Sequence, residues 1–504
     1  MLIPFYGISQ KISILGVIKD QQTGAFPTPE PPPYAGGDFV LGELKAFPSA
    51  DGMGKYASGG RGGTIIEVTN NNDGGVGSLE AALEAVGSRI IVGTTGQRIT
   101  GIDVTNLNNG DITILGQTFE GSGLMHYGAF EINGASNFVI RHMDFVQGDP
   151  WIGTGRDALK IQARFSGNPS VYDGIIDHST FFWGDDENLS FYADTDGRVV
   201  SDITVQNSIL SESFRAEKGI LLYNNAYNIS FLNNLSTNHG ERSMVRVSVG
   251  TASFELINNV SHFSKQPPSQ FNVQNVFDYI GNVDYRGSES LYTSRQIKVE
   301  NSTSNATTLG YGSWNASLTR GYIVGNYIDG ISQNIISNAD WNDASYRETS
   351  KILNSGSRII DDTATNIRDF VLVNVGSNRN TSALEQRQID DVLGNTTGGL
   401  KKLESETVGK GTHLSGTAKT DTDGDYIPDT WETAMGLDLN SAADATTKPT
   451  SFTIDGITYD NREYTGGIYN GFVYTGGTLT GSNLYDWREI YWEDLANGFQ
   501  TMHY

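Results

Sequence analysis

Cysteine is absent from this chain of 504 residues, and long apolar runs and basic residues are scarce. The chain therefore has no disulfide framework, but a protein of this size needs none, so the absence does not fix a compartment. No run reaches the roughly 18 apolar residues of a membrane-spanning helix, and no such helix is expected. The stretch 1–19 lacks a basic start, so it matches a secretory signal poorly.

Basic residues are few: 34 Lys and Arg stand against 58 Asp and Glu, which gives a formal net charge of −24. Nucleic acid is not an expected partner, because contact with the phosphate backbone requires a basic surface. The acidity favours solubility. An acidic protein can still bind an acidic polymer where bound cations and a few Arg or Lys residues reverse the local charge.

Glycine is abundant, with 60 residues, and asparagine often occurs in pairs such as Asn233-Asn234 and Asn258-Asn259. Between these turn-forming residues, short β-branched runs begin every 25 to 36 residues, which is typical of a solenoid. The alternation is strand-like, which excludes a helical repeat, and a leucine-rich repeat is disfavoured because its Leu/Asn frame is missing. The sequence therefore predicts an all-β, right-handed parallel β-helix with Asn at its corners. The runs are ITILGQT (112–118), VIRHMDF (139–145), IIDHSTF (175–181), ITVQNSI (203–209), ISFLNNL (229–235) and FELINNV (254–260).

A second set of strand-like segments lies between these runs, at 157–162, 187–192, 218–223 and 243–249. In a solenoid, equivalent segments of successive turns stack about 4.8 Å apart, so their polar residues should form one line on one face. We expect this line to contain Asp157, Asp186, Glu187, Lys218, Arg242 and Arg246.

Acidic residues gather at one end of the expected line and basic residues at the other. Carboxylates at this spacing can hold Ca²⁺, and a bound ion would make the proton beside a sugar carboxylate more acidic. A positioned base could then remove that proton and start a β-elimination. Arginine normally stays protonated, so Arg242 would need Lys218 and Arg246 as cationic neighbours to serve as that base. Charges on the face of a solenoid are more often simply solvated, and the separation of acids from bases is what favours a site.

Composition divides the chain into four parts. Residues 1–44 form an N-terminal segment with a proline-rich linker (26–33), suited to attachment or oligomer contact. We expect the β-helix over 45–377, with a short capping helix that begins after Ser78. An irregular connection should follow over 378–419, and a small calcium-loop module with an aromatic tail over 420–504.

Three motifs carry a resemblance to a known family: AFPSADGMGKYASGGRGG (46–63), EVTNNNDGGVGSLEAAL (67–83) and IIDHSTFFWGDDENLSFY (175–192). They resemble polysaccharide lyase family 1, the pectate lyases, including phage-borne members. The resemblance implies an extracellular parallel β-helix that cleaves an acidic, uronate-containing polysaccharide with the help of Ca²⁺. It is good over about 45–265 and thins out after that.

The resemblance also implies roles for individual residues. Asp157 and Asp186, with Glu187 beside it, match calcium ligands, and Lys218 matches a substrate-binding lysine. Arg242 matches the catalytic arginine and Arg246 a supporting one, whereas Asp177 and His178 match a signature that is mostly structural. Two departures are Ser190, where many members carry a third acidic ligand, and the absence of proline between Arg242 and Arg246.

A second calcium candidate lies in DTDGDYIPDTWE, where closely spaced carboxylates can converge on one ion in a tight loop. The expected ligands are Asp421, Asp423, Asp425 and Asp429, with a structural role. Tyr and Trp residues are dense after this loop, and we expect them mainly to fill a core or an interface rather than to stack on sugars.

Two other functions remain open on sequence alone. A glycoside hydrolase on the same fold could use paired carboxylates such as Asp185 and Asp186. A non-catalytic carbohydrate-binding virion or surface protein could share the fold without any chemistry. The N-terminal segment and its linker would suit a phage tailspike, and by that analogy the chain would form a homotrimer and contact virion tail proteins.

Overall fold

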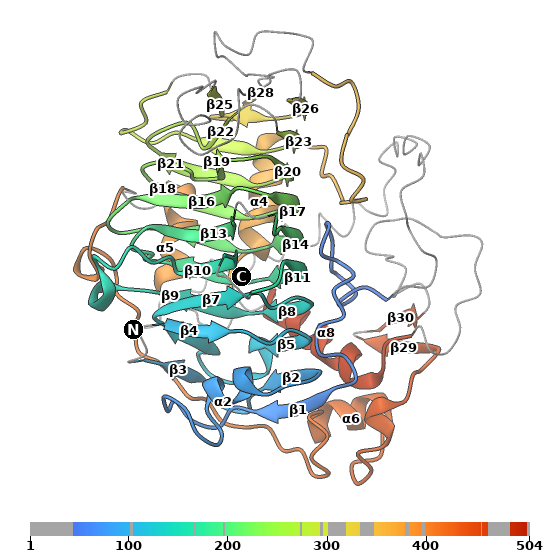
Figure 1. Ribbon diagram of the computed structural model, residues 1–504. Coiled ribbons are helices and arrows are strands. Elements are labelled where there is room, and N and C mark those ends of the chain that lie inside the picture. The colour runs from blue at the N-terminus through green and yellow to red at the C-terminus, as the bar shows by residue number, and fades with distance from the viewer. Residues whose placement is uncertain are drawn as a thin grey trace, which may run out of the picture.

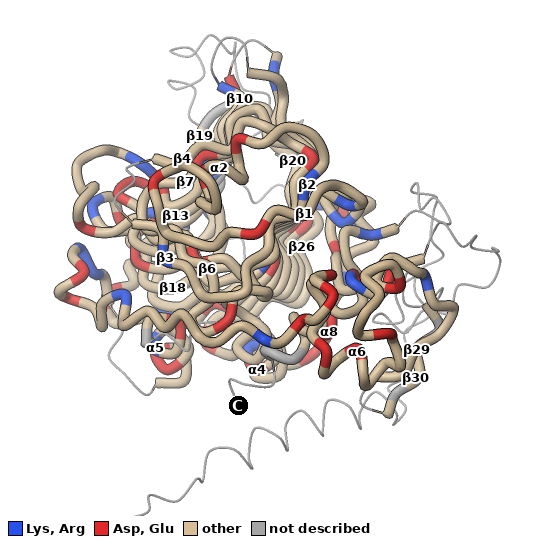
Figure 2. Tube along the Cα trace, turned by 90° about the horizontal axis from the view of Figure 1, so that it is seen from below, with Lys and Arg blue, Asp and Glu red and all other residues tan. Residues whose placement is uncertain are grey.

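The structure is a computed structural model. It describes residues 44–100, 104–164, 168–194, 197–272, 275–292, 296–300, 319–332, 347–377, 383–394, 399–454, 456–461 and 484–500. Short strands wind into a right-handed parallel β-helix with three long sheets, as the repeats predict, and the coil is seen from the side in Figure 1 and nearly end-on in Figure 2. The described pairings in the three sheets are parallel except for the last one, between β27 and β28.

The three sheets are named here by their strands in spatial order. Sheet A contains β1 (Thr64–Glu67), β2 (Arg89–Val92), β5 (Ile112–Leu115), β8 (Phe138–Arg141), β11 (Val171–Asp177), β14 (Val200–Gln206), β17 (Ala226–Leu232), β20 (Ala252–Ile257), β23 (Val276–Ile280) and β26 (Arg320–Val324). Sheet B contains β3 (Gln97–Ile99), β6 (Leu124–Tyr127), β9 (Met143–Val146), β12 (Thr180–Phe182), β15 (Ile209–Ser211), β18 (Leu235–His239), β21 (Val260–Ser264), β24 (Val283–Tyr285), β27 (Tyr327–Ile328) and β28 (Ile331–Ser332). Sheet C contains β4 (Val104–Leu107), β7 (Ala129–Asn133), β10 (Leu159–Ala163), β13 (Glu187–Ala193), β16 (Lys218–Tyr223), β19 (Val245–Val249), β22 (Ser269–Asn272) and β25 (Ile297–Glu300).

Both sets of sequence repeats become stacked strands. The six runs of the first set each begin in a strand of sheet A and continue past its end, and the second set forms strands β10, β13, β16 and β19 of sheet C. The side chains that point inward are apolar and fully buried, and equivalent positions stack from turn to turn. The rings of Phe145 and Phe181, for example, lie parallel with centroids 5.4 Å apart. The repeat period therefore predicts the architecture correctly.

The asparagine pairs form the corner between sheets A and B. The first residue of a pair is left-handed, as at Asn233 (φ 55°) and Asn258 (φ 53°), which asparagine tolerates better than most residues. The second residue turns inward and bonds to the next turn, so that Asn234, Asn259 and Asn282 form a buried ladder with amide contacts of 3.0 Å. Asn326, just after β26, continues the ladder.

A segment that we call the strap (residues 44–63) lies across the outer face of sheet A. Its backbone amides donate to side chains on successive strands, from Ser230 through Thr204 to Thr113. Two glycines permit this approach, because a Cβ at Gly54 or Gly60 would lie 1.8 Å from a backbone oxygen of the sheet. The glycine-rich motif at 46–63 is thus explained by the close contact of two backbones.

The predicted capping helix is present as α2 (Leu79–Glu84). Ser78 is its N-cap, and its hydroxyl accepts a hydrogen bond from the Ala81 amide at 3.1 Å. Leu79 and Leu83 are buried against the first turn and belong to the main core. The helix therefore covers the end of the coil that would otherwise expose its apolar interior.

Two further helices, α4 (Ala364–Asn374) and α5 (Ala383–Val392), pack on the outer face of sheet B (Figure 1). Helix α5 lies inside 378–419, so the expected irregular connection there is corrected to a helix followed by an extended segment. That segment returns along the coil, from a bond between Gly399 and Asn238 to an ion pair between Lys419 and Glu120.

The C-terminal part folds beside the first strands of sheet A and contains α6 (Asp429–Met435), the hairpin β29 (Ser451–Ile454) and β30 (Ile457–Asp460), and α8 (Trp487–Gln500) (Figure 2). Tyr485, Tyr491 and Trp492 are buried in its contacts, as expected for core residues, whereas the other tyrosines noted between 462 and 483 lie outside the described residues. None of the described helices is long and apolar enough to cross a membrane.

Candidate active site

The expected line of charged residues forms where the strands of sheet C begin. Glu187 and Lys218 are the first residues of β13 and β16, and they are direct neighbours in the parallel register. Asp157 precedes β10 and Arg242 precedes β19, one turn to either side. The corner before sheet C thus brings together residues that are 85 positions apart in the chain, from Asp157 to Arg242.

Three carboxylates converge at this corner. Asp157, Asp186 and Glu187 each offer an oxygen, and these oxygens lie within 4.8 Å of one another. Asp157 also accepts a hydrogen bond from the Glu187 amide at 3.0 Å, which fixes the two residues relative to each other. Burial, and next the negative charge of Asp157, raise the pKa of Glu187 to about 8. Ionisation of all three carboxyl groups is therefore unfavourable unless nearby cations compensate their charge.

Lys218 and Arg242 supply positive charge directly beside these carboxylates. The Lys218 ammonium lies 2.5 Å from Asp186 Oδ1 and 3.8 Å from Glu187 Oε1. The Arg242 guanidinium donates to Glu187 and has its Nε 3.3 Å from Glu241. Both side chains are partly exposed, so a ligand at this corner could reach them.

The backbone of Arg242 has a left-handed conformation, with φ 62°. This region costs an L-residue about 1–2 kcal/mol, and such conformations occur often at functional positions. Gly219 on the neighbouring turn makes room for it, because a Cβ there would lie 2.3 Å from the Arg242 carbonyl oxygen. The Lys218-Gly219 pair therefore combines a charged side chain with the space that the next turn needs.

Arg246 lies one row further into sheet C, in register with Leu221 and Gln270. Its guanidinium donates to the side-chain oxygen of Gln270 at 2.7 Å. It shares the outer face of sheet C with the corner cluster, and it lies within β19, whereas Arg242 precedes that strand.

Ser190, the main departure from the family pattern, is fully buried and donates its hydroxyl to Asp157. Lys160 is a residue that the sequence reasoning missed, and its ammonium lies 3.3 Å from Asp157 Oδ2. Burial lowers the pKa of Lys160, but Asp157 and Glu131 outweigh burial and raise it overall. In the register it lies one turn before Ser190, a pairing that the sequence pattern alone does not reveal.

Asp177 and His178 lie at the corner between sheets A and B, away from this cluster. Asp177 is buried and accepts from Arg141 and Gln206 at 2.9 and 2.8 Å. His178 is left-handed at φ 46° and stacks on His142. Their contacts are internal, in agreement with the structural role that the resemblance implies.

Asp185, the carboxylate of the hydrolase alternative, is buried and holds a loop in place. It accepts from the amides of Gly153 and Gly155 at 2.9 and 2.5 Å and from Arg215 at 2.9 Å. Burial raises its pKa, but these donors outweigh burial and lower it overall. A carboxyl group held ionised in this way is poorly suited to act as a general acid.

The acidic residues of the C-terminal loop lie far along the chain from this corner and form two linked groups. Asp421, Asp423 and Asp425 are one group, and Asp425, Glu432 and Asp444 are the other, each with oxygens within 4.8 Å. Asp429 is directed elsewhere, because its two oxygens accept from the amide and the hydroxyl of Thr422 at 2.7 Å.

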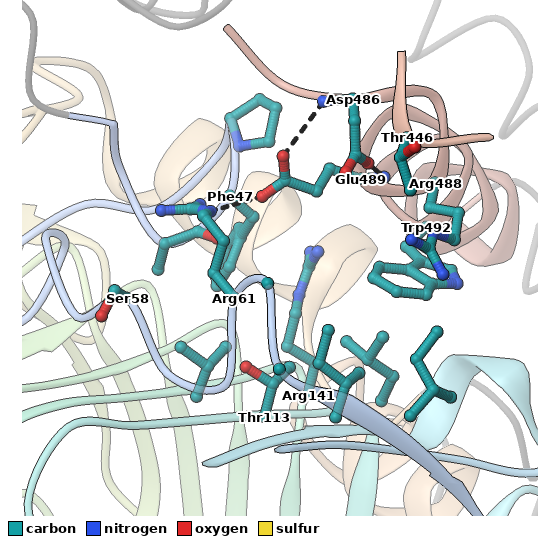
Figure 3. A pocket seen from close by; sticks show the side chains of 18 residues that line it. Phe47, Ser58, Arg61, Thr113, Arg141, Thr446, Asp486, Arg488, Glu489 and Trp492 are labelled. Carbon is teal, nitrogen blue, oxygen red and sulfur yellow. Dashed lines mark hydrogen bonds and ion pairs between the residues drawn. The ribbon is translucent and has the colours of Figure 1, made fainter. Parts of the chain in front are cut away.

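A pocket of about 270 Å³ lies on another side of the coil, between the strap, sheet A and helix α8 (Figure 3). Two of its arginines are held by ion pairs: Arg61 Nε lies 2.5 Å from Glu489, which also lines the pocket, and Arg141 pairs with Asp177 and Glu493. None of the residues of the corner cluster lines this pocket. It is therefore a packing space under the C-terminal part rather than an extension of the candidate active site.

No known family model matches this chain. Similar curated proteins are named probable pectate lyase C. The one from Aspergillus fumigatus is 29% identical over 411 residues, covering 79% of this chain and 89% of the relative. The one from Emericella nidulans is 28% identical over 409 residues, covering 79% and 88%. A solved structure of a Bacillus subtilis pectate lyase mutant aligns with a TM-score of 0.43 at 14% identity, covering 68% of this chain and all of that one.

Proposed function

We propose that this chain, which resembles pectate lyases over 79% of its length, is a polysaccharide lyase that cleaves a uronate-containing, pectate-like polymer by calcium-assisted β-elimination. The observation that carries the proposal is the corner before sheet C, where three carboxylates meet Lys218 and Arg242 in a surface-accessible position. An extracellular location belongs to the same proposal, because its substrate is a large polymer.

The corner residues fit a calcium ion. Ca²⁺ prefers several carboxylate oxygens, and Asp157, Asp186 and Glu187 offer three in close proximity. Burial and then the nearby negative charge of Asp157 raise the pKa of Glu187 to about 8, which a bound cation would counteract. When bound there, calcium would polarise the uronate carboxylate and make the proton on the adjacent ring carbon more acidic.

The roles of the basic residues follow from their positions. Lys218 and Arg246 bind and orient the negatively charged sugar along the outer face of sheet C. Arg242, as a neutral guanidine beside the cationic Lys218, takes the proton from the ring carbon next to the carboxylate and becomes a guanidinium. The electron pair of that C–H bond forms a double bond in the ring, the glycosidic C–O bond breaks, and the leaving oxygen takes a proton from water.

The test is Arg242→Lys. Lysine keeps the positive charge, so polymer binding should stay within about threefold of wild type, but the group is misplaced for the ring proton. General-base steps contribute on the order of 10²–10⁴-fold, so turnover should fall by that amount. Turnover is followed by the ultraviolet absorbance of the unsaturated product with several uronate polymers.

Arg320→Lys is the matched control, because Arg320 is exposed on strand β26 and pairs only with Glu348 among the contacts described. It should leave turnover unchanged. If Arg242→Lys keeps full activity on a polymer that wild type cleaves, Arg242 is not the base.

The alternatives give other outcomes in the same assay. A hydrolase would release reducing ends without an unsaturated product, but the buried, loop-holding position of Asp185 argues against it. A non-catalytic binding protein would release no product. The tailspike context finds no support among the fungal relatives, and the segment 1–43 lies outside the described residues.

A further inference from the structure

The C-terminal acidic loop has the spacing of a twelve-residue calcium loop. Counting from Asp421, acidic residues fall at positions 1, 3, 5, 9 and 12, the last being Glu432. Position 6 of such loops is normally glycine because the chain turns sharply there, and Tyr426 occupies it with φ 72°. The backbone thus adopts the turn even without the usual residue.

Glu432 provides an observation that the spacing alone does not. Its side chain is fully buried, with 0% exposed, and neither carboxylate oxygen has a hydrogen-bond partner among the described residues. Both oxygens of Asp423 and one each of Asp425 and Asp444 also lack a partner within the described part of the chain. Buried carboxylates without donors are costly, and such groups usually coordinate a metal or pair with a cation.

The other two aspartates of the loop have different contacts. Asp421 accepts from the amides of Gly424 and Tyr426 at 2.8 and 2.9 Å, which folds the loop while its oxygens stay near those of Asp423 and Asp425. Asp429 has both oxygens bonded to Thr422. Asp444 therefore takes the place in the cluster that the spacing would give to Asp429.

We propose that this cluster binds one Ca²⁺ ion through Asp421, Asp423, Asp425, Glu432 and Asp444, with Asp429 outside the ligand set. Oxygen-only ligands in this number suit calcium better than the smaller Mg²⁺, which demands six ligands in near-ideal octahedral geometry. This site is independent of the lyase proposal, since it shares no residue with the corner before sheet C.

The ion would hold together two segments that dock on the β-helix. Ile427, inside the loop, and Ala445, next to Asp444, are both fully buried in a cluster with Ile90 and Leu115 of sheet A. A ligand from each segment on the same ion fixes their relative position. Calcium therefore stabilises the contact between the C-terminal part and the first turns of the coil.

The experiment uses the full chain after treatment with chelator, titrated with calcium chloride by calorimetry and followed by thermal unfolding. Glu432→Gln and Asp444→Asn should each weaken calcium binding at this site at least about tenfold and remove most of the calcium-dependent rise in Tm. In chelator, Glu432→Gln should melt above wild type, because it removes an unpaired buried charge.

Two controls make the result specific. Asp429→Asn should bind calcium within about threefold of wild type. Glu187→Gln, at the candidate active site, should keep the calcium-dependent rise in Tm, which separates this site from the lyase proposal. If both Glu432→Gln and Asp444→Asn bind calcium as tightly as wild type, the proposed site is overturned. The ligand set is overturned if Asp429→Asn weakens calcium binding as much as Glu432→Gln does while Asp444→Asn leaves it unchanged.

Discussion

Gly219 and Arg242 depend on each other, because the Arg242 carbonyl oxygen lies 2.3 Å from where a Cβ at position 219 would be. Arg242 in turn has a left-handed backbone that places its side chain over Glu187. A glycine that looks like an ordinary strand residue therefore controls the position of the proposed base.

Gly219→Ala should displace Arg242 and lower kcat by about tenfold or more, with a smaller change in KM, because misplacing a catalytic group by an ångström is costly. Initial rates on a uronate polymer measure both constants. Gly321→Ala is the control, since its Cβ would meet the Phe277 ring at 2.4 Å on sheet A and so perturbs packing away from the corner. Equal losses of kcat in the two variants would mean that the effect is general destabilisation.

Motifs predict which residue types meet at the corner, but not all of their contacts. The sequence places Asp157, Lys218 and Arg242 on one line, and the structure brings them together there. It does not predict that Lys160 and Ser190 both bind Asp157. Periodicity shows that two turns stack, but the exact register, which puts Lys160 beside Ser190, depends on turn lengths that a pattern does not reveal.

Among the elements, the asparagine ladder links successive turns most directly. Asn259 donates to Asn282 and to the Phe231 carbonyl at 3.0 and 2.9 Å, and it accepts from Asn234. All of these groups are buried, so each bond lost leaves a polar group without a partner.

Asn259→Ala should lower the free energy of unfolding by about 2–4 kcal/mol, because it leaves several buried groups of the ladder unsatisfied. Denaturant unfolding followed by circular dichroism measures the change. Asn71→Ala, at an exposed asparagine, should change stability by less than about 0.5 kcal/mol. If Asn259→Ala also changes the free energy of unfolding by less than about 0.5 kcal/mol, water replaces the hydrogen bonds that the Asn259 side chain made.

Helix α5, like α4 inside the expected β-helix range 45–377, is an element that sequence reasoning missed, and the buried face of α5 explains why. Gln388 is fully buried and accepts from Ser211, Thr237 and Asn238 of sheet B. Glu385 likewise accepts from Thr180. Because polar side chains lie between Leu384 and Val392 on the buried face, they interrupt the apolar stripe that usually indicates a packed helix.

At the scale of the whole molecule, a buried ion-pair network joins the C-terminal part to the coil. Arg141 of β8 lies 2.9 Å from Asp177 of β11 and 2.7 Å from Glu493 of helix α8, and all three are buried. Burial alone would raise the pKa of Asp177, but His178 and Arg141 outweigh it and hold the pKa below its usual range.

A carboxyl group whose pKa is lowered by folding stabilises the folded protein at any pH above its pKa in the unfolded chain, which is about 4. This contribution is lost as the pH falls below that value toward the pKa of the folded state. Arg141→Met should cost about 3–5 kcal/mol at neutral pH, because it removes the cation that two buried carboxylates share. Tm measured from neutral pH down to about pH 3 should show the gap between wild type and variant narrowing on acidification. If the difference in Tm between wild type and variant does not change with pH, the charge of Asp177 does not contribute to this stabilisation.

The same contact affects how the protein is made. Ser49 in the strap donates to Glu493 in helix α8, which is 444 residues later in the chain. At typical rates of synthesis these two residues leave the ribosome roughly 20 to 90 seconds apart. During that interval the apolar side chains of Ile90, Val92 and Leu115 lack the cover that Tyr491 and Trp492 later provide. The first turns of the coil therefore stay open to chaperones and proteases until the distant segment that covers them has been translated.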